Sequence, residues 1–400
     1  MMRNMKYFFV LGTNTALSIA ELGAIFDLSK SKLLAPDFLL ADLDVEINSE
    51  TLINRLGGTI KIGIIRAEVD INNNPDLVKA VIKLAAQKKE NAAEGKFNFG
   101  YSCYGQNNFN KKDLGIKVKN YFNEHEISSR FVVSQEKTLS SVVITQNKLL
   151  TRGIEIVLVN DNENKKALIG ETISTQPFKD LSRRDFGRPA RDDLSGMLPP
   201  KIALIMLNLA QVKSNDSVIV DPFCGSGTIL SEALLLGYNN LFGSDISIKA
   251  IEDTRINTSW LKELYSLKDF HLKLLVKNVA NLSKFIKSNY VEAIVTEPYL
   301  GPQRGLLNFK IINKNLEDLY STAISEFHKV LKNGGRVVMI WPSFYGQRPI
   351  TPSYRGFKIV DMIPENLAAG QYVNKNTRPT IIYGRPGQKV FREIVVLEKM

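Results

Sequence analysis

Residues 218–230 combine a short apolar run, an acid and a glycine-rich turn in a pattern typical of nucleotide-binding loops. Val218 to Val220 lead to Asp221, and Pro-Phe-Cys-Gly-Ser-Gly-Thr follows at 222–228. Gly225 and Gly227 permit positive φ and close approach of the backbone to a ligand, and the start of the next helix suits a carboxylate. The pattern predicts an adenosyl cofactor, and hence S-adenosylmethionine (SAM) and methyl transfer, at the carboxyl edge of a parallel sheet. A tight turn without ligand is the alternative.

Two further strand ends carry polar residues that complete this hypothesis. Asp245, in Gly-Ser-Asp-Ile, lies about twenty residues after the loop, where an acid accepts hydrogen bonds from both ribose hydroxyls; a helix N-cap is its alternative role. Asn278 follows the next apolar run and is placed to reach the adenine amino group, although a plain turn fits nearly as well. The residues expected to surround SAM are Asp221, Phe223, Gly225, Ser226, Gly227, Thr228, Asp245, Ile246, Asn278 and Val279.

The acceptor of the methyl group is indicated by Glu297-Pro298-Tyr299, which follows another apolar run. Glu297 and the Pro298 carbonyl can accept the two hydrogens of an amine on a planar base, and Tyr299 can stack on that base. Catalysis would then consist mainly of positioning the amine nitrogen against the methyl carbon. A proline-containing turn that closes a strand is the structural alternative.

Alternating strand and helix patterns must position these motifs. From residue 218 onward they predict a doubly wound parallel sheet with an antiparallel last strand, and so an α/β fold. The chain before about residue 170 reads as mixed α+β with short elements. The strands expected are 5–11, 38–43, 58–66, 97–104, 130–134, 141–145, 154–159, 218–220, 241–244, 272–276, 293–296 and 336–341, and a hairpin around 385–387 closes the chain.

The net charge of the chain indicates which class of molecule it binds. The formal charge of +11 and a pI near 9.3 suit a polyanion such as nucleic acid, with simple solubility as the alternative. Basic residues interleave with aromatic ones between 83 and 130, either as an RNA-facing surface or as solvated lysines. Arg183, Arg184, Arg188 and Arg191 crowd one turn of the segment 183–200. Part of this segment could form a wall of the cofactor pocket, and its arginines either meet phosphate or lie in a solvated linker.

The cysteines and histidines indicate no metal or disulfide chemistry. Cys103 and Cys224 have no disulfide or zinc-ligand spacing, which indicates a cytoplasmic protein, and Cys224 is expected to pack rather than to react. The three histidines are scattered, and no metal site is expected. No apolar stretch reaches the length of a membrane span.

Nearly the whole chain resembles the THUMP-domain RNA methyltransferases, in particular the branch that modifies N2 of tRNA guanosine 10. Besides the cofactor and acceptor motifs, the segments that carry the resemblance are 7–12, 17–22, 134–136, 139–142, 147–149, 184–189 and 196–200. The resemblance implies a ferredoxin-like domain at 1–60, a THUMP domain at 61–170 that grips the tRNA acceptor end, and a Rossmann-like methyltransferase domain at 171–400. It also implies that Glu297 to Tyr299 hold the guanine amine. A monomer is favoured.

One departure from the family pattern keeps other functions open. The family motif is Asp-Pro-Pro-Tyr-Gly, whereas residues 297–301 read Glu-Pro-Tyr-Leu-Gly. The acid is one methylene longer and the ring one position earlier. The alternatives are an adenine N6-methyltransferase acting on RNA or DNA, a catalytically silent tRNA-binding module, and a small-molecule methyltransferase. The number of methyl groups added is left open.

Overall fold

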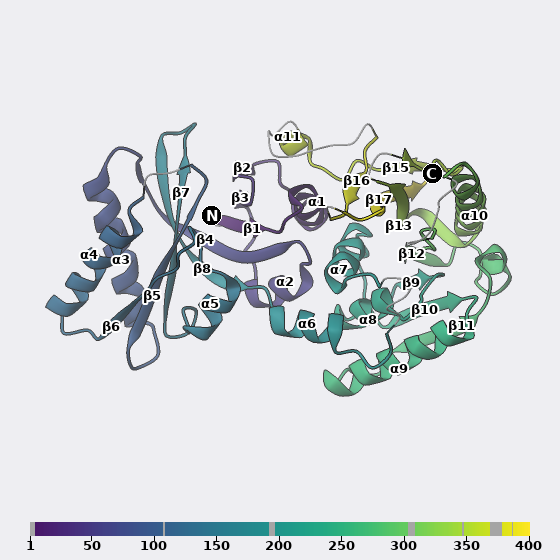
Figure 1. The fold of residues 1–400 in the computed structure, drawn as a ribbon, viewed down its shortest axis with the longest axis horizontal. Coiled ribbons are helices and arrows are strands. Elements are labelled where there is room, and N and C mark those ends of the chain that lie inside the picture. Colours follow the sequence, from purple (N-terminus) through teal and green to yellow (C-terminus); the bar gives the residue numbers. More distant parts are fainter. Residues whose placement is uncertain are drawn as a thin grey trace.

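The computed structural model describes residues 5–106, 109–191, 197–302, 309–345, 348–368, 378–385 and 387–400. Two β-sheets lie one after the other along the long axis of the molecule (Figure 1). The first belongs to the N-terminal part of the chain and the second to the C-terminal part. Part of the 196–200 segment and Pro386 of the expected terminal hairpin lie outside the described residues.

The first sheet has eight strands in the order β2-β3-β1-β4-β8-β7-β5-β6. Helices α3 and α4 pack on β5 and β7 through one apolar cluster, since Leu77, Val81 and Leu84 form a stripe at helical spacing. The elements are β1 (Met5–Leu11), α1 (Thr15–Ile25), β2 (Lys32–Ala35), β3 (Phe38–Leu43), α2 (Ser49–Arg55), β4 (Thr59–Asp70), α3 (Asn74–Glu90), β5 (Phe97–Tyr104), α4 (Lys111–Glu124), β6 (Ser129–Val132), α5 (Ser141–Gln146), β7 (Gly153–Asp161) and β8 (Lys166–Thr175).

Residues 141–145 form a helix, so the strand expected there is wrong. Ser140 caps α5, because its hydroxyl accepts a hydrogen bond from the Val143 amide at 3.3 Å. The cap and the burial of Ile144 outweigh the preference of the neighbouring valines for strands. Residues 172–175, whose sequence shows no strong period, form the end of strand β8. β4 runs across the expected divide between residues 60 and 61, and the division of the N-terminal half into two domains stays a prediction.

The second sheet confirms the Rossmann-like expectation. Its order is β11-β10-β9-β12-β13-β17-β15, with the first five strands parallel and β17 antiparallel to β13. The hairpin at the end of the chain is formed by β16 and β17. The elements are α6 (Phe178–Phe186), α7 (Pro200–Leu209), β9 (Val218–Asp221), α8 (Thr228–Leu235), β10 (Asn240–Asp245), α9 (Ile248–Leu264), β11 (His271–Val276), η1 (Val279–Lys284), β12 (Val291–Thr296), α10 (Phe309–Val330), β13 (Leu331–Phe344), β14 (Arg348–Pro349), β15 (Phe357–Ile359), α11 (Glu365–Ala368), β16 (Ile381–Tyr383) and β17 (Val390–Lys399).

The order of these strands creates a switch point between β9 and β12. From β9 the chain runs through β10 and β11 in one direction and then returns to β12 on the other side of β9. Ligands of open parallel sheets bind outside the carboxyl ends of the strands at such a point. Asp221 ends β9, and Glu297 directly follows β12. The topology therefore brings the two motifs to one place.

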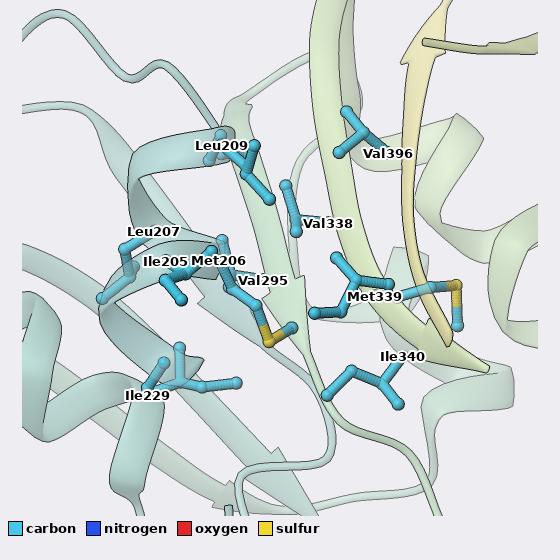
Figure 2. Close-up of a cluster of buried hydrophobic side chains, with 14 of the residues drawn as sticks. Ile205, Met206, Leu207, Leu209, Ile229, Val295, Val338, Met339, Ile340 and Val396 are labelled. Atoms are coloured by element: carbon cyan, nitrogen blue, oxygen red, sulfur yellow. The ribbon is translucent and has the colours of Figure 1, made fainter. Parts of the chain in front are cut away.

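A dense apolar core holds the strand ends in position. Figure 2 shows Met206 and Leu209 of α7 and Ile229 of α8 near Val295 of β12 and Val338 of β13, and all five side chains are at most 3% exposed. Packing at this density leaves side chains little freedom to shift. Thr296 and Glu297 directly follow Val295 and belong to the site. The packing of Val295 in this core therefore fixes their position.

A buried polar network ties the N-terminal helix α1 to α7 of the second half. The Glu21 carboxylate accepts hydrogen bonds from the amides of Gly57 and Gly58 at 2.8 and 2.7 Å and from the Asn208 side chain at 2.8 Å. Burial raises the pKa of Glu21 to about 7. Asn208 lies on α7, so a single carboxylate joins the two halves of the molecule.

In the part of the chain that is described, no helix is long and apolar enough to cross a membrane.

Candidate active site

A cavity of about 800 Å³ opens at the carboxyl ends of β9, β10 and β12. It is lined by the three acceptor residues and by every expected cofactor residue except Gly227. Cavities of this size accommodate ligands as large as a nucleoside derivative. The structure thus brings into one cavity motifs that are more than 70 residues apart in sequence.

The glycine loop leaves the start of α8 open towards this cavity. Gly225 and Gly227 have φ of 52° and 82°, in the left-handed region. A Cβ at Gly227 would lie 2.8 Å from Thr254, so the glycine lets α9 pack closely, whereas a Cβ at Gly225 would meet nothing within 4 Å. Among the described residues, no side chain caps the first turn of α8. Its free amides are therefore available to an anion.

Asp221 is almost fully buried beside the acceptor motif. Its Oδ1 accepts hydrogen bonds from the Thr296 hydroxyl at 2.7 Å and from the Phe223 amide at 3.2 Å. Burial, with smaller contributions from Asp245 and Glu297, raises the pKa of Asp221 to about 7. A cation next to this carboxyl would favour its ionised form.

Asp245 supports the loop and does not cap the following helix. Its two oxygens accept hydrogen bonds from the Gly225 amide at 3.2 Å and the Ser247 amide at 2.9 Å. The N-cap of α9 is Ser247, whose hydroxyl accepts from the Ala250 amide, so the capping alternative for Asp245 is wrong. Asn278 caps the short helix η1 through the Ala280 amide at 2.9 Å. Their contacts to ribose and adenine stay predictions.

Glu297 is held by an arginine that the sequence motifs did not indicate. Arg392 of β17 donates from Nε to Glu297 Oε1 at 2.6 Å, and each side chain is 14% exposed. Oε2 of Glu297 accepts no hydrogen bond from the described residues. The two residues lie 95 positions apart, so only the antiparallel pairing of β17 with β13 brings them together.

The backbone of the acceptor motif is fixed while its aromatic ring is free. The buried Tyr320 hydroxyl donates to the Tyr299 carbonyl at 3.0 Å, and Pro298 is buried. The Tyr299 side chain itself is 61% exposed. A rigid backbone with an exposed ring at the edge of a cavity suits stacking on a planar base.

Two of the four arginines before α7, Arg184 and Arg188, are buried, so neither a phosphate contact nor a solvated linker describes them. Met197 and Leu198 of the same segment line the cavity, as expected for part of it. Arg184 forms two hydrogen bonds with Glu232 at 2.8 and 3.1 Å. Arg188 donates to the Thr228 hydroxyl at 2.6 Å, and Arg191 donates to the Phe186 carbonyl at 2.8 Å. Buried guanidinium groups do not reach a nucleic-acid phosphate, and they are not in a solvated linker. Arg183 is exposed.

Cys224 packs rather than reacts, as expected. It is 5% exposed, and its sulfur lies 3.7 Å from the Thr254 hydroxyl. Burial raises the pKa of its thiol far above the ordinary value, and a neutral buried thiol is a poor nucleophile. Cys103 is buried and free as well.

The charges of the cavity fit SAM. Asp221, Asp245 and Glu297 line it, and SAM carries two cations, its sulfonium and its ammonium. Carboxylates in a partly desolvated cavity attract such cations more strongly than they would in water. The open amides of α8 suit the single carboxylate of the cofactor. The residues present therefore fit the group that the glycine loop implies.

Comparisons with known proteins agree with this geometry. The UPF0020 family model, described as an RMKL-like methyltransferase domain, matches residues 188–345. The tRNA (guanine(10)-N2)-dimethyltransferase of Pyrococcus abyssi is 26% identical over 362 residues, which are 89% of this chain and 94% of that protein. A probable tRNA (guanine(10)-N2)-dimethyltransferase of Methanothermococcus thermolithotrophicus is 34% identical over 123 residues, 30% of this chain and 72% of that protein.

A solved structure shows the same fold over the full length. The crystal structure of TrmN from Thermus thermophilus matches with a TM-score of 0.54 at 17% identity, and the match covers 99% of this chain and 100% of that one. The parallel sheet, the glycine loop and these relatives lead to one assignment. The chain belongs to the tRNA (guanine(10)-N2)-dimethyltransferase family and is a SAM-dependent methyltransferase.

Proposed function

We propose that this protein transfers methyl groups from SAM to the exocyclic N2 amine of a guanosine in tRNA, at position 10. The names of the relatives support the substrate. The observation that carries the proposal is the hydrogen bond between Thr296 and Asp221 at 2.7 Å. Because Glu297 directly follows Thr296, the acceptor motif and the cofactor loop are joined at one wall of the cavity.

The cofactor would be held by the residues of the loop and of the two strand ends. When bound, SAM supplies an electrophilic methyl group on a positively charged sulfur. Asp221 balances positive charge on the methionine part, and Asp245, already fixed by the Gly225 amide, accepts hydrogen bonds from the ribose. Ile246, which is 72% exposed, and Val279 offer apolar surface beside the adenine.

The acceptor amine would be oriented by Glu297 and Pro298. One amine hydrogen is donated to Glu297 Oε2, which the described residues leave free, and the other to the Pro298 carbonyl. These bonds return electron density to a nitrogen whose lone pair is delocalised into the guanine ring, and they align it with the methyl carbon. After transfer the nitrogen loses one proton, for which Glu297 is the acceptor. Tyr299 stacks on the base.

The N-terminal half would bind the tRNA body. Lys83, Lys112, Lys119 and Arg130 are exposed. Lys88 and Lys117 instead form ion pairs with Glu171 and Asp113 at 2.8 and 2.7 Å, so they contribute less charge to such a surface. Through Glu21 and Asn208 the two halves are connected directly, which fits a bound tRNA held at a constant offset from the cavity. Action as a monomer in the cytoplasm completes the proposal.

Inosine provides the sharpest test, because it lacks only the N2 amine of guanosine. Purified protein is incubated with labelled SAM and tRNA transcripts that carry guanosine, inosine or adenosine at position 10. Label is expected with guanosine alone, and nucleoside mass spectrometry then counts the methyl groups. Label with inosine would refute N2 as the target, and label with adenosine would favour N6-methylation. tRNA binding and SAM binding without any label would indicate the silent module.

A further inference from the structure

Tyr345 directly follows β13 and combines an exposed aromatic side chain with a left-handed backbone. Its φ is 55°, and the residue is 49% exposed. Of the described non-glycine residues with positive φ, it is the only aromatic one. A bulky residue in this conformation is strained, and such strain is found mainly where function requires a particular side chain. The ring therefore needs an explanation other than the turn itself.

The ring of Tyr345 forms an aromatic cluster with Phe309 and Phe344. The ring centroid of Phe309 lies 5.4 Å from that of Phe344 and 5.8 Å from that of Tyr345. Phe344 is fully buried and Phe309 is half-buried. The buried phenylalanine anchors the cluster in the core, and Tyr345 is its most exposed member.

The aromatic cluster adjoins the wall of the cavity. Gly301 lines the cavity, and a Cβ at Gly301 would lie 3.2 Å from the Phe344 ring. Because β13 is parallel to β12, Tyr345 lies at the same carboxyl edge of the sheet as Glu297. A polymer that leaves the cavity on the side of β13 would therefore meet Tyr345.

The charged side chains next to the aromatic cluster are basic. The first two turns of α10 contain Lys310 and Lys314 and no acidic residue, and both lysines are exposed. The carbonyl of Lys389 accepts a hydrogen bond from the Tyr345 amide at 2.7 Å, so a third lysine is its direct neighbour. Basic side chains around an exposed aromatic ring match a nucleobase and its phosphates.

Methylation of a base amine inside a stacked nucleic acid requires that base to leave the stack. The nucleotides on either side of it then each lose one stacking partner, and an exposed aromatic ring beside the cavity can replace that partner. We propose that Tyr345 stacks on the nucleobase adjacent to the target guanosine and that the neighbouring lysines contact the RNA backbone. The inference rests on the proposed function and deepens it, because it adds a substrate contact outside the acceptor motif.

Abasic tRNA tests this contact, because it lacks one nucleobase and keeps the backbone. Methylation by the full chain and by Tyr345→Gly is measured at saturating SAM with normal tRNA and with transcripts that are abasic directly before or directly after the target. Tyr345→Gly is expected to lower kcat/KM about tenfold with normal tRNA, within the range for one base stacked on an aromatic ring. With one of the two abasic transcripts it should lower kcat/KM less than about twofold, because contacting partners are not additive.

Tyr290→Ala is the matched control, because Tyr290 is 47% exposed but precedes β12, at the opposite edge of the sheet from the cavity. It should leave kcat/KM unchanged with every transcript. Tyr345→Phe keeps the ring and should keep most of the rate. Glycine adopts positive φ without strain, so the thermal midpoint of Tyr345→Gly should not fall. Tyr345→Asn, which also tolerates this conformation, repeats the measurement with a second residue.

Two results would overturn the inference: no loss of kcat/KM in Tyr345→Gly with normal tRNA, or the same loss with normal tRNA and both abasic transcripts. A wild type that binds tRNA and transfers no methyl group would instead refute the proposed function. In that case the tRNA affinities of the wild type and of Tyr345→Gly replace the rates, and equal affinities would overturn the inference as well.

Discussion

The N-terminal sheet and the cavity both bury charged side chains, but they satisfy them to different extents. In the sheet, Lys61 and Glu155 are at most 2% exposed and 2.6 Å apart. The lysine also donates to the Leu139 carbonyl at 2.6 Å. Glu155 additionally accepts from the hydroxyls of Ser102 and Thr172. At the cavity, Glu297 keeps one oxygen free of described hydrogen-bond donors.

This difference separates charges that maintain the architecture from charges that await a ligand. A buried pair far from any cavity has no later partner, so the chain must complete its hydrogen bonds internally. In a binding site the missing partners belong to the cofactor and the substrate, and the free protein bears the cost of leaving them open. Four predictions test whether the distinction holds.

The largest effect is expected where the satisfied pair is broken. Glu155→Leu leaves the Lys61 ammonium buried without its counter-charge, which costs about 3–5 kcal/mol of unfolding free energy. Urea unfolding of the full chain measures this loss. The double variant Lys61→Met with Glu155→Leu replaces the pair by apolar groups and is expected to recover most of the stability. A loss below about 1 kcal/mol for the single variant would contradict the architectural role of the pair.

A substitution of a charged residue at the cavity should change activity and not stability. Glu297→Gln retains the shape of the side chain but weakens its acceptor, and initial methylation rates are expected to fall about 100-fold or more through lost positioning and proton acceptance. The thermal midpoint should change little, which melting curves measure. Unchanged rates would remove Glu297 from the acceptor site.

Arg392 is expected to have an intermediate effect, because it positions Glu297 without touching the base. Arg392→Met frees Oε1 of the carboxylate and is expected to lower kcat about tenfold, the worth of one charge-assisted hydrogen bond, with little change in KM for tRNA. Arg392→Lys should restore part of the rate. If Arg392 had a purely structural role, both variants would instead lose stability, and kcat would not fall selectively while KM for tRNA stays the same.

The smallest effect is a pH dependence of cofactor binding through Asp221. The folded-state pKa of Asp221 is raised to about 7, and a cationic ligand favours the ionised carboxylate. SAM should therefore bind about threefold more tightly at about pH 7.5 than at about pH 6.5. Asp221→Asn should abolish this dependence in calorimetric titrations. The raised pKa also means that the contribution of Asp221 to stability is lost as the pH rises from about 4 towards 7.

Local patterns in the sequence were sufficient for much of the fold. The glycine loop, the strand ends at Asp221 and Asp245 and the acceptor motif after β12 are defined by residues within a few positions of one another, and the structure places them as expected. Prediction from local patterns was wrong at 141–145, where two valines indicated a strand. There the Ser140 cap and the burial of Ile144 decide the conformation.

Contacts between distant segments were beyond the reach of such patterns. Arg392 meets Glu297 only because β17 runs antiparallel to β13 in one register. Arg184 and Arg188 looked alike in a basic turn, yet one reaches Glu232 and the other reaches Thr228. A linear pattern contains no information on which of two similar side chains will find a carboxylate after the helices pack.

The amino-acid sequence by itself determined the methyltransferase sheet, the SAM loop and the residue types at the acceptor motif, because each is encoded in short-range periodicity and turn chemistry. The tertiary structure alone decided which charged side chains have all their hydrogen-bond partners within the protein and which do not. Burial and pairing depend on elements that meet in three dimensions from positions as distant as 297 and 392. The polar atoms left without a hydrogen-bond partner, rather than the motifs alone, indicate how the protein would bind its cofactor and its substrate.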